Sequence, residues 1–293
     1  MTRNMMLKRR LATVAATMLL AAHGIAHAAP QPPGFDIWLA PVSGEGELRN
    51  LTSRPGYDNQ PAFESENRIL FTRIADDVPQ TDLARLDIAS GEVSPLLVTP
   101  ESEYSPTPND RGTVSAVRVS MDGVQQLWEL PPGADRYEPL LAGIEGVGYH
   151  LWLDPQRVAL FIVEQPSELH IANLDTGKVL VLAKDIGRSM HRPPGTRNVI
   201  AFTEPGQEGK RWIKTLDLDE RKLVPVAPVL EGSQDFAYLP DGRIVMASGK
   251  TVYAWQQGKW QELAAFPDLP GDISRIAVSP SGERLALVVA EDE

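Results

Sequence analysis

Two histidines, His150 and His191, are the residues of this sequence whose type and placement are best suited to chemistry. Imidazole nitrogens combined with carboxylate oxygens form the ligand sets that zinc and similar divalent ions favour, and Glu103 or Asp235 could supply the carboxylate. The same side chains could instead act as general acid and base, which requires two of them within reach of one substrate. A third possibility is that both imidazoles only hydrogen-bond loop backbone. The surroundings of the two rings decide between a metal site, a proton-transfer pair and a structural role.

Both histidines occupy the same place in a repeating pattern of apolar strands. Each lies eight residues before an apolar anchor at which a strand is predicted, and successive anchors are separated by 45, 44, 41, 45 and 41 residues. A polar or Gly/Pro-rich turn precedes every anchor. The six anchors are Ile69, Val114, Val158, Val199, Ile244 and Leu285.

Each complete repeat contains four predicted strands: one before the anchor, the anchor strand, and two that follow. In the fourth repeat, for example, strands are predicted at 212–216 and 223–229, separated by a polar turn. The outermost strands of the first two repeats are predicted at 93–98 and 137–141. Four short strands within about 40 to 50 residues are typical of a β-propeller blade. We therefore predict an all-β fold, a six-bladed β-propeller of four-stranded antiparallel blades.

The sixth blade is predicted to be shared by the two ends of the sequence. Residues 275–289 read as a first and second strand joined by a turn, with nothing after them to complete a blade. The missing third and fourth strands are predicted at 36–40 and 47–52. The ring should close two strands on two, which makes 35–293 a single domain.

The first strand of each propeller blade lines the central channel, so residues around these strands should gather at one rim. The position eight residues before each anchor is occupied by Pro61, Pro106, His150, His191, Phe236 and Ala277, and Tyr57 lies a little upstream of the first. A concave site with convergent polar groups is the usual place for a ligand. We predict a binding rim without catalytic residues, formed by Asp58, Asn59, Glu103, Tyr104, Tyr149, His150, Arg188, His191, Gln234, Asp235 and Arg275.

Other motifs in the sequence do not indicate a catalytic site. Residues 248–251 resemble the end of a phosphate-binding loop, but Ile244 replaces the first glycine and no helix is predicted to follow, so they are interpreted as a hairpin turn. His170 stands where other repeats carry a third-strand aromatic residue, which predicts a packed ring. The sequence contains no serine nucleophile elbow, paired-cysteine metal motif or glycine-rich dinucleotide loop.

Several turns and strands carry a recognisable repeat signature: an apolar-x-x-Pro-Asp-Gly turn, an Ile/Leu-Trp/Tyr third strand and a Leu-Thr ending. The best matches are residues 238–242, 278–282, 37–38, 127–128 and 51–52. In these residues, and across almost all of 35–289, the chain resembles the TolB-like, or PD40, six-bladed propellers. The resemblance is specific for fold and weak for function. It does not extend to the extra amino-terminal domain of the namesake protein or to the carboxy-terminal serine hydrolase of some relatives. Other relatives are sugar lyases with metal-binding histidines at the ring's centre.

Residues 1–28 have the features of a secretory signal peptide. A basic start with Arg9 and Arg10 is followed by an apolar stretch at 11–22 and a small-x-small cleavage site at 26–28. About 12 apolar residues fall short of the roughly 20 that a membrane span needs. A short Pro-rich leader at 29–34 follows. We expect a periplasmic or secreted mature chain with no membrane span.

Composition narrows the classes of partner. Loss of the four basic residues of the signal peptide changes the formal net charge from −11 to −15. Such an acidic surface repels nucleic acid at long range. The sequence has no cysteine, which excludes disulfides and a lipid anchor on cysteine.

Together these features favour a monomeric, non-enzymatic propeller, without a cofactor, that binds a protein or peptide of the cell envelope through its polar rim. The alternative is an enzyme of the sugar lyase or hydrolase type that acts in the same central funnel. In that alternative a divalent metal in the central channel would be held by His150 and His191.

Overall fold

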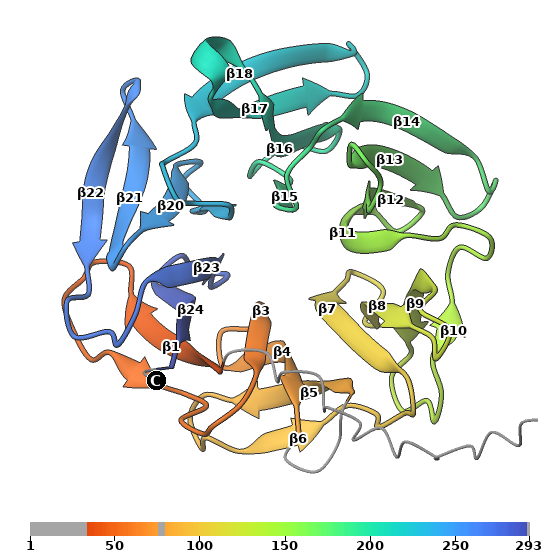
Figure 1. Cartoon of the computed structure of the whole chain (residues 1–293), viewed down its shortest axis with the longest axis horizontal. Coiled ribbons are helices and arrows are strands. Elements are labelled where there is room, and N and C mark those ends of the chain that lie inside the picture. Colours follow the sequence, from red (N-terminus) through yellow and green to blue (C-terminus); the bar gives the residue numbers. More distant parts are fainter. Residues whose placement is uncertain (1–33, 76–79, 292–293) are drawn as a thin grey trace, which may run out of the picture. The chain divides into compact units, whose positions relative to one another are not determined.

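The computed structural model describes residues 34–75 and 80–291 (Figure 1). The predicted signal peptide at 1–28 and residues 29–33 of the predicted leader lie outside the described residues. The described chain forms six four-stranded antiparallel sheets arranged as blades around a central channel. The predicted fold, a six-bladed β-propeller, is confirmed.

In blades 1 to 3 the strands run outward from the channel in chain order. Blade 1 contains β3 (Asp58–Ser65), β4 (Arg68–Ile74), β5 (Thr81–Asp87) and β6 (Val93–Pro95). Blade 2 contains β7 (Ser102–Pro108), β8 (Val114–Val119), β9 (Gln125–Leu130) and β10 (Glu138–Pro139). Blade 3 contains β11 (Val147–Asp154), β12 (Arg157–Ile162), β13 (Glu168–Asn173) and β14 (Val179–Lys184).

Blades 4 and 5 have the same order, and blade 6 is assembled from both ends of the chain. Blade 4 contains β15 (Met190–His191), β16 (Val199–Pro205), the one-turn helix η1 (Gln207–Gly209), β17 (Arg211–Asp217) and β18 (Lys222–Pro228). Blade 5 contains β19 (Phe236–Tyr238), β20 (Ile244–Ser248), β21 (Thr251–Gln256) and β22 (Lys259–Ala265). Blade 6 contains β23 (Ile273–Val278), β24 (Arg284–Ala290), β1 (Phe35–Pro41) and β2 (Arg49–Asn50).

The seam between β1 and β24 closes the ring two strands on two, as the sequence predicts. Seven residue pairs join the strands, from Phe35 opposite Ala290 to Pro41 opposite Arg284. Beyond the ladder, the Glu291 backbone amide donates to the Gly34 carbonyl at 3.0 Å, and a Glu291 carboxylate oxygen accepts from the Gly56 amide at 3.0 Å. The carboxy-terminal strand is therefore tied both to the amino-terminal strand and to the loop that leads into blade 1.

Apolar residues of β24 are buried on both faces of their blade. Leu285, Leu287 and Val289 pack toward blade 5, in a cluster with Val245 and other residues of that blade. Ala286 and Val288 pack toward blade 1, in a different cluster. Side chains alternate between the faces of a strand, so a continuous apolar run fits a strand that is covered by a blade on each side.

The outermost strands are shorter than predicted in three blades. The strand predicted at 93–98 corresponds to β6, which ends at Pro95. The Leu96 amide still donates to the Leu83 carbonyl at 2.9 Å, and the side chains of Leu96 and Leu97 pack on the core between blades 1 and 2. The prediction at 137–141 corresponds to the two residues of β10, which also ends in a proline. Proline lacks the N–H that continues a ladder. The prediction at 47–52 likewise corresponds to the two residues of β2.

Over residues 34–75 and 80–291, no helix has the length and apolar character that crossing a membrane requires.

Candidate binding site in the central channel

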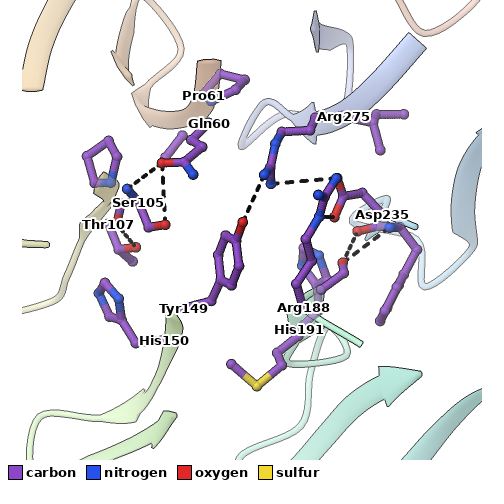
Figure 2. Close-up of a pocket in the computed structure, with 16 residues that line it drawn as sticks. Gln60, Pro61, Ser105, Thr107, Tyr149, His150, Arg188, His191, Asp235 and Arg275 are labelled. Atoms are coloured by element: carbon purple, nitrogen blue, oxygen red, sulfur yellow. Dashed lines mark hydrogen bonds and ion pairs between the residues drawn. The ribbon is translucent and has the colours of Figure 1, made fainter. Parts of the chain in front are cut away.

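A hollow of about 180 Å³ opens in the channel near the ends at which the inner strands begin (Figure 2). Every blade contributes the residue that lies nine positions before its anchor, so the repeat itself builds the wall. These six residues are Gln60, Ser105, Tyr149, Met190, Asp235 and Ile276.

A charged network crosses one side of the hollow. The Arg188 guanidinium donates two hydrogen bonds to the Asp235 carboxylate, from Nε at 3.1 Å and from Nη2 at 2.7 Å. Arg275 approaches the same carboxylate only to 3.7 Å and donates from Nη2 to the Tyr149 hydroxyl at 2.9 Å. Bidentate pairs are the strong form of this contact. Arg188 is thus the principal partner of Asp235, and Arg275 is held by Tyr149.

Tyr57 lies close to this network. Burial raises the pKa of the Tyr57 phenol, while the positive charges of Arg275 and Arg188 oppose the rise, and the phenols of Tyr149 and Tyr104 add to it. Tyr57 is therefore within electrostatic reach of both arginines. At neutral pH the Tyr57 phenol keeps its proton and can act as a hydrogen-bond donor.

Two left-handed residues bring polar groups into the opposite side of the hollow. Gln60 and Ser105 have φ values of 56° and 55°, each directly before a proline and each at a bulge where its strand loses register. Bulges re-aim side chains and recur near functional sites. The Ser105 backbone amide donates to Gln60 Oε1 at 2.7 Å. Because that atom must be the oxygen, the amide nitrogen of Gln60 is turned toward the middle of the hollow, as Figure 2 shows.

His150 is a buried ring with one partner. Its Nε2 lies 2.6 Å from the hydroxyl of Ser115, which also accepts from Trp152 Nε1 at 2.8 Å and reaches the Thr107 carbonyl at 3.2 Å. One serine proton can satisfy all three contacts only if it goes to Thr107 and Nε2–H of the histidine donates to the serine. Nδ1, which has no hydrogen-bond partner, then carries a lone pair. Burial lowers the pKa of His150 to about 3.

His191 packs against aromatic rings of blade 5. Its ring centroid lies 4.8 Å from that of Phe236 and 6.5 Å from that of Tyr238. Burial lowers the pKa of His191 to about 4, although Asp235 and the Phe236 backbone favour the protonated form. At neutral pH both histidines of the hollow are therefore uncharged, and its positive charge comes from arginine alone.

Six of the residues predicted for the rim line the hollow: Tyr149, His150, Arg188, His191, Asp235 and Arg275. The other five lie away from its lining. Asp58 is buried and accepts from Arg54 at 2.8 Å, and the buried Asn59 accepts from the Gln60 amide at 2.8 Å. Tyr104 packs on the core between blades 2 and 3, and Gln234 is exposed.

The fifth, Glu103, is fully buried between blades 1 and 2. Its carboxylate accepts from Thr99 at 2.6 Å and from Arg118 at 3.0 Å, and the Arg118 guanidinium also stacks over Trp128 at 4.8 Å. Burial raises the pKa of Glu103 to about 7, against the opposing effect of those hydrogen bonds. This carboxyl belongs to a structural cluster and does not line the hollow.

The hollow offers hydrogen bonds and charge. Within the described ranges no three His, Asp or Glu side chains are grouped as metal ligands. Ser115 beside His150 resembles a serine–base pair, but it is completely buried and shares its hydroxyl among three partners. Attack on a substrate needs an accessible nucleophile.

Gln60 and Ser105 were missed as site residues. Each lies one residue before a proline that was predicted to face the channel. In the same way, Tyr149 lies one residue before His150, and Asp235 lies one residue before Phe236. Counting nine residues back from every anchor identifies both Gln60 and Ser105.

No family model and no curated protein matches the chain. Solved structures share its fold. A candidate TolB from Agrobacterium tumefaciens is 14% identical with a TM-score of 0.69, the match covering 89% of this chain and 100% of that one. A gluconolactonase from Xanthomonas campestris is 12% identical with a TM-score of 0.63, covering 90% and 100%. An oligogalacturonate lyase in complex with manganese is 12% identical with a TM-score of 0.57, covering 84% and 80%. The resemblance to TolB-like propellers is confirmed at the level of fold.

Proposed function

We propose that this chain is a non-enzymatic binding protein of the cell envelope, periplasmic or secreted, and that it engages a protein or peptide through the hollow. The observation that carries the proposal is the network of Arg188, Asp235, Arg275 and Tyr149. These side chains come from four blades and hold one another in place before any ligand arrives. A preorganised polar site loses little side-chain freedom on binding.

The size of the hollow supports recognition of a small part of a partner. At about 180 Å³ it can take one side chain or a chain end, and it is too small for a folded element. The rest of a partner would lie over the rim. The fold similarity to the TolB structure is consistent with a binding role, while fold alone does not assign one.

The test is a cross-linked pull-down from envelope extract. The variant Arg188→Glu, His191→Ala reverses one charge and removes one ring of the hollow, whereas Arg243→Gln changes a partly exposed arginine outside the hollow that pairs with Asp241 in the β19–β20 turn. We expect wild type and Arg243→Gln to capture the same proteins and the double variant to lose at least one of them. Equal capture by all three would show that the hollow does not bind the partner.

A second candidate function, an enzyme of the sugar lyase or hydrolase type, is favoured by two observations. The gluconolactonase and the oligogalacturonate lyase share the fold, and His150, which lines the hollow, has a ring nitrogen, Nδ1, without a hydrogen-bond partner. A metal-dependent version would use His150 and His191 and would need a further ligand, because the described residues contain no group of three metal-ligating side chains. Stoichiometric metal in the purified protein that is lost on His150→Ala would favour this enzyme over the binding protein.

A further inference from the structure

We infer that the hollow is a receptor for a single carboxylate presented by a peptide, with Arg275 as the group that binds it. The inference rests on the proposed function and names the chemistry that the partner must carry. It follows from the balance of charge in the hollow, from the donors that face its middle and from the space between them.

The charge balance leaves one positive charge without a full partner. Arg188, Asp235 and Arg275 are the charged residues that line the hollow, and both of its histidines are neutral. Arg188 and Asp235 compensate each other through two hydrogen bonds, whereas Arg275 lies 3.7 Å from the carboxylate and otherwise contacts the hydroxyl and the ring of Tyr149. A site with surplus positive charge inside an acidic protein selects an anion locally.

The groups around Arg275 are hydrogen-bond donors. The Tyr149 hydroxyl accepts a hydrogen bond from Arg275, so its own proton remains free to donate. The amide nitrogen of Gln60 points toward the same space, because its oxygen is used by Ser105 and by Thr72, at 2.7 and 2.9 Å. Figure 2 shows this nitrogen, the Tyr149 hydroxyl and the Arg275 guanidinium turned toward the middle of the hollow.

A carboxylate matches this arrangement better than a neutral group. Its two oxygens accept several hydrogen bonds, and guanidinium binds it with favourable geometry. A neutral amide would place a second donor against groups that already donate. A peptide delivers a carboxylate either as an Asp or Glu side chain or as its carboxyl terminus, and both are small enough for the hollow.

The experiment is an NMR titration that follows the arginine Nε–H signals of the full protein. The probes are an acetylated and amidated pentapeptide with one central glutamate, the same peptide with glutamine, and an acetylated all-alanine pentapeptide with a free carboxyl terminus. We expect the glutamate peptide, the free-carboxylate peptide or both to shift the signal that Arg275→Gln removes, and the glutamine peptide to leave it unmoved. The tighter of the two acidic peptides identifies the source of the carboxylate.

Variants separate recognition from stability. Arg275→Gln should weaken binding about tenfold or more, as expected for loss of a charge-assisted hydrogen bond, and Tyr149→Phe should weaken it less. Asp235→Asn should strengthen binding, because it removes the internal competitor; a role of Asp235 in folding alone would not produce tighter binding. Arg243→Gln, with the same loss of charge, should bind like wild type, and melting curves show that each variant is folded.

Three results would overturn the inference: equal binding of the glutamine peptide, unchanged affinity in Arg275→Gln, or tighter binding of galacturonic acid than of every peptide, which would indicate a sugar acid instead. Failure here is distinguishable from failure of the proposed function. If Arg275→Gln still captures a partner that the Arg188→Glu, His191→Ala variant loses, the function stands without the carboxylate. If no partner depends on the hollow and the glutamate peptide still binds, the receptor stands without the function.

Discussion

At the scale of single residues, the two ring nitrogens of His150 have different environments. Nε2 is fixed by Ser115, while Nδ1 is buried in the wall of the hollow without a partner. Burial makes the charged form of this ring costly, and the same holds for His191. Both therefore titrate far below the pH at which free histidine does. They affect how the stability of the protein depends on pH, and they add no charge to the hollow at neutral pH.

The first prediction concerns acid stability. His150 has a folded pKa of about 3, below the ordinary value of 6.5, so its contribution to stability is complete above pH 6.5 and is lost as pH falls toward 3. Between pH 6.5 and 5 the loss should be about 2 kcal/mol. Denaturant unfolding at both pH values should show that His150→Gln loses this part of the pH dependence. The control His170→Gln, outside the hollow, should retain it, and an unchanged slope in His150→Gln would contradict the assignment.

Glu103 acts in the opposite direction over an overlapping window. Its folded pKa of about 7 lies above the ordinary value of 4.5, so its contribution is complete below pH 4.5 and is lost as pH rises through 7. Wild-type stability alone would mix the two effects. The difference between each variant and wild type at matched pH separates them.

At the scale of elements, β24 and β1 stabilise the ring because each is buried on both faces. Ile37, Leu287 and Val288 are at most 1% exposed, in clusters shared with blades 1 and 5. Closing a loop of roughly 240 residues costs on the order of 5 kcal/mol. Each fully buried aliphatic side chain of the seam returns about 1.5 to 3 kcal/mol, so a few of them suffice.

The seam gives a second prediction. Leu287→Ala should lower the free energy of unfolding by about 2 to 5 kcal/mol, as for other buried leucines, and deletion of residues 275–293 should leave a protein that aggregates or does not melt cooperatively. Leu180→Ala, on the exposed outer strand of blade 3, is the matched control and should cost much less. Calorimetry measures all three. A soluble truncation with a cooperative transition would disprove closure as the source of stability.

The outer strand β14 differs from the other five outer strands that the structure describes. Its residues Val179, Leu180, Val181 and Leu182 are 37 to 58% exposed. By contrast, β2, β6 and β10 are two or three residues long, β18 contains two prolines, and β22 carries charged residues. Short length, proline and charge are the usual protections of a sheet edge, and β14 has little of them.

A third prediction follows for β14. Val181→Lys should raise the concentration at which the purified protein begins to associate, because a charge blocks edge-to-edge pairing. Its melting temperature should remain close to that of wild type, since Val181 is half exposed. Light scattering over a concentration series measures the effect. Lys222→Gln, which removes a charge from β18, serves as the comparison, and equal association of Val181→Lys and wild type would count against an adhesive β14.

The repeat made the strand positions predictable because six copies of the same apolar pattern reinforce one another. It did not predict where the outer strands end: β6 and β10 end at Pro95 and Pro139, with one further backbone hydrogen bond after each proline, and the side chains of Leu96 and Leu97 pack on the core. Within the site, the period identified Tyr149 and Asp235. The left-handed conformations of Gln60 and Ser105, both before proline, arise from packing between blades 1 and 2 and could not be read from local preferences, which disfavour them.

At the scale of the whole molecule, the hollow and the closure of the ring are physically joined. Tyr57, beside the arginines, follows Gly56, whose amide is held by Glu291 and whose carbonyl accepts from Phe35 at 2.8 Å. The rings of Phe35 and Tyr57 meet edge to face at 6.0 Å. Arg275 itself belongs to β23 of the closing blade. A ligand bound by Arg275 would therefore stabilise the closed ring by mass action.

The antiparallel β1–β24 seam also sets how the molecule responds to tension. Phe35 lies opposite Ala290 at one end of the ladder, so both strands leave the seam on the same side. Pulling these two residues apart would break the hydrogen bonds of their pair first and then those of the other six pairs one after another. A closure that resists heat through burial on both faces would thus yield to a small directed force.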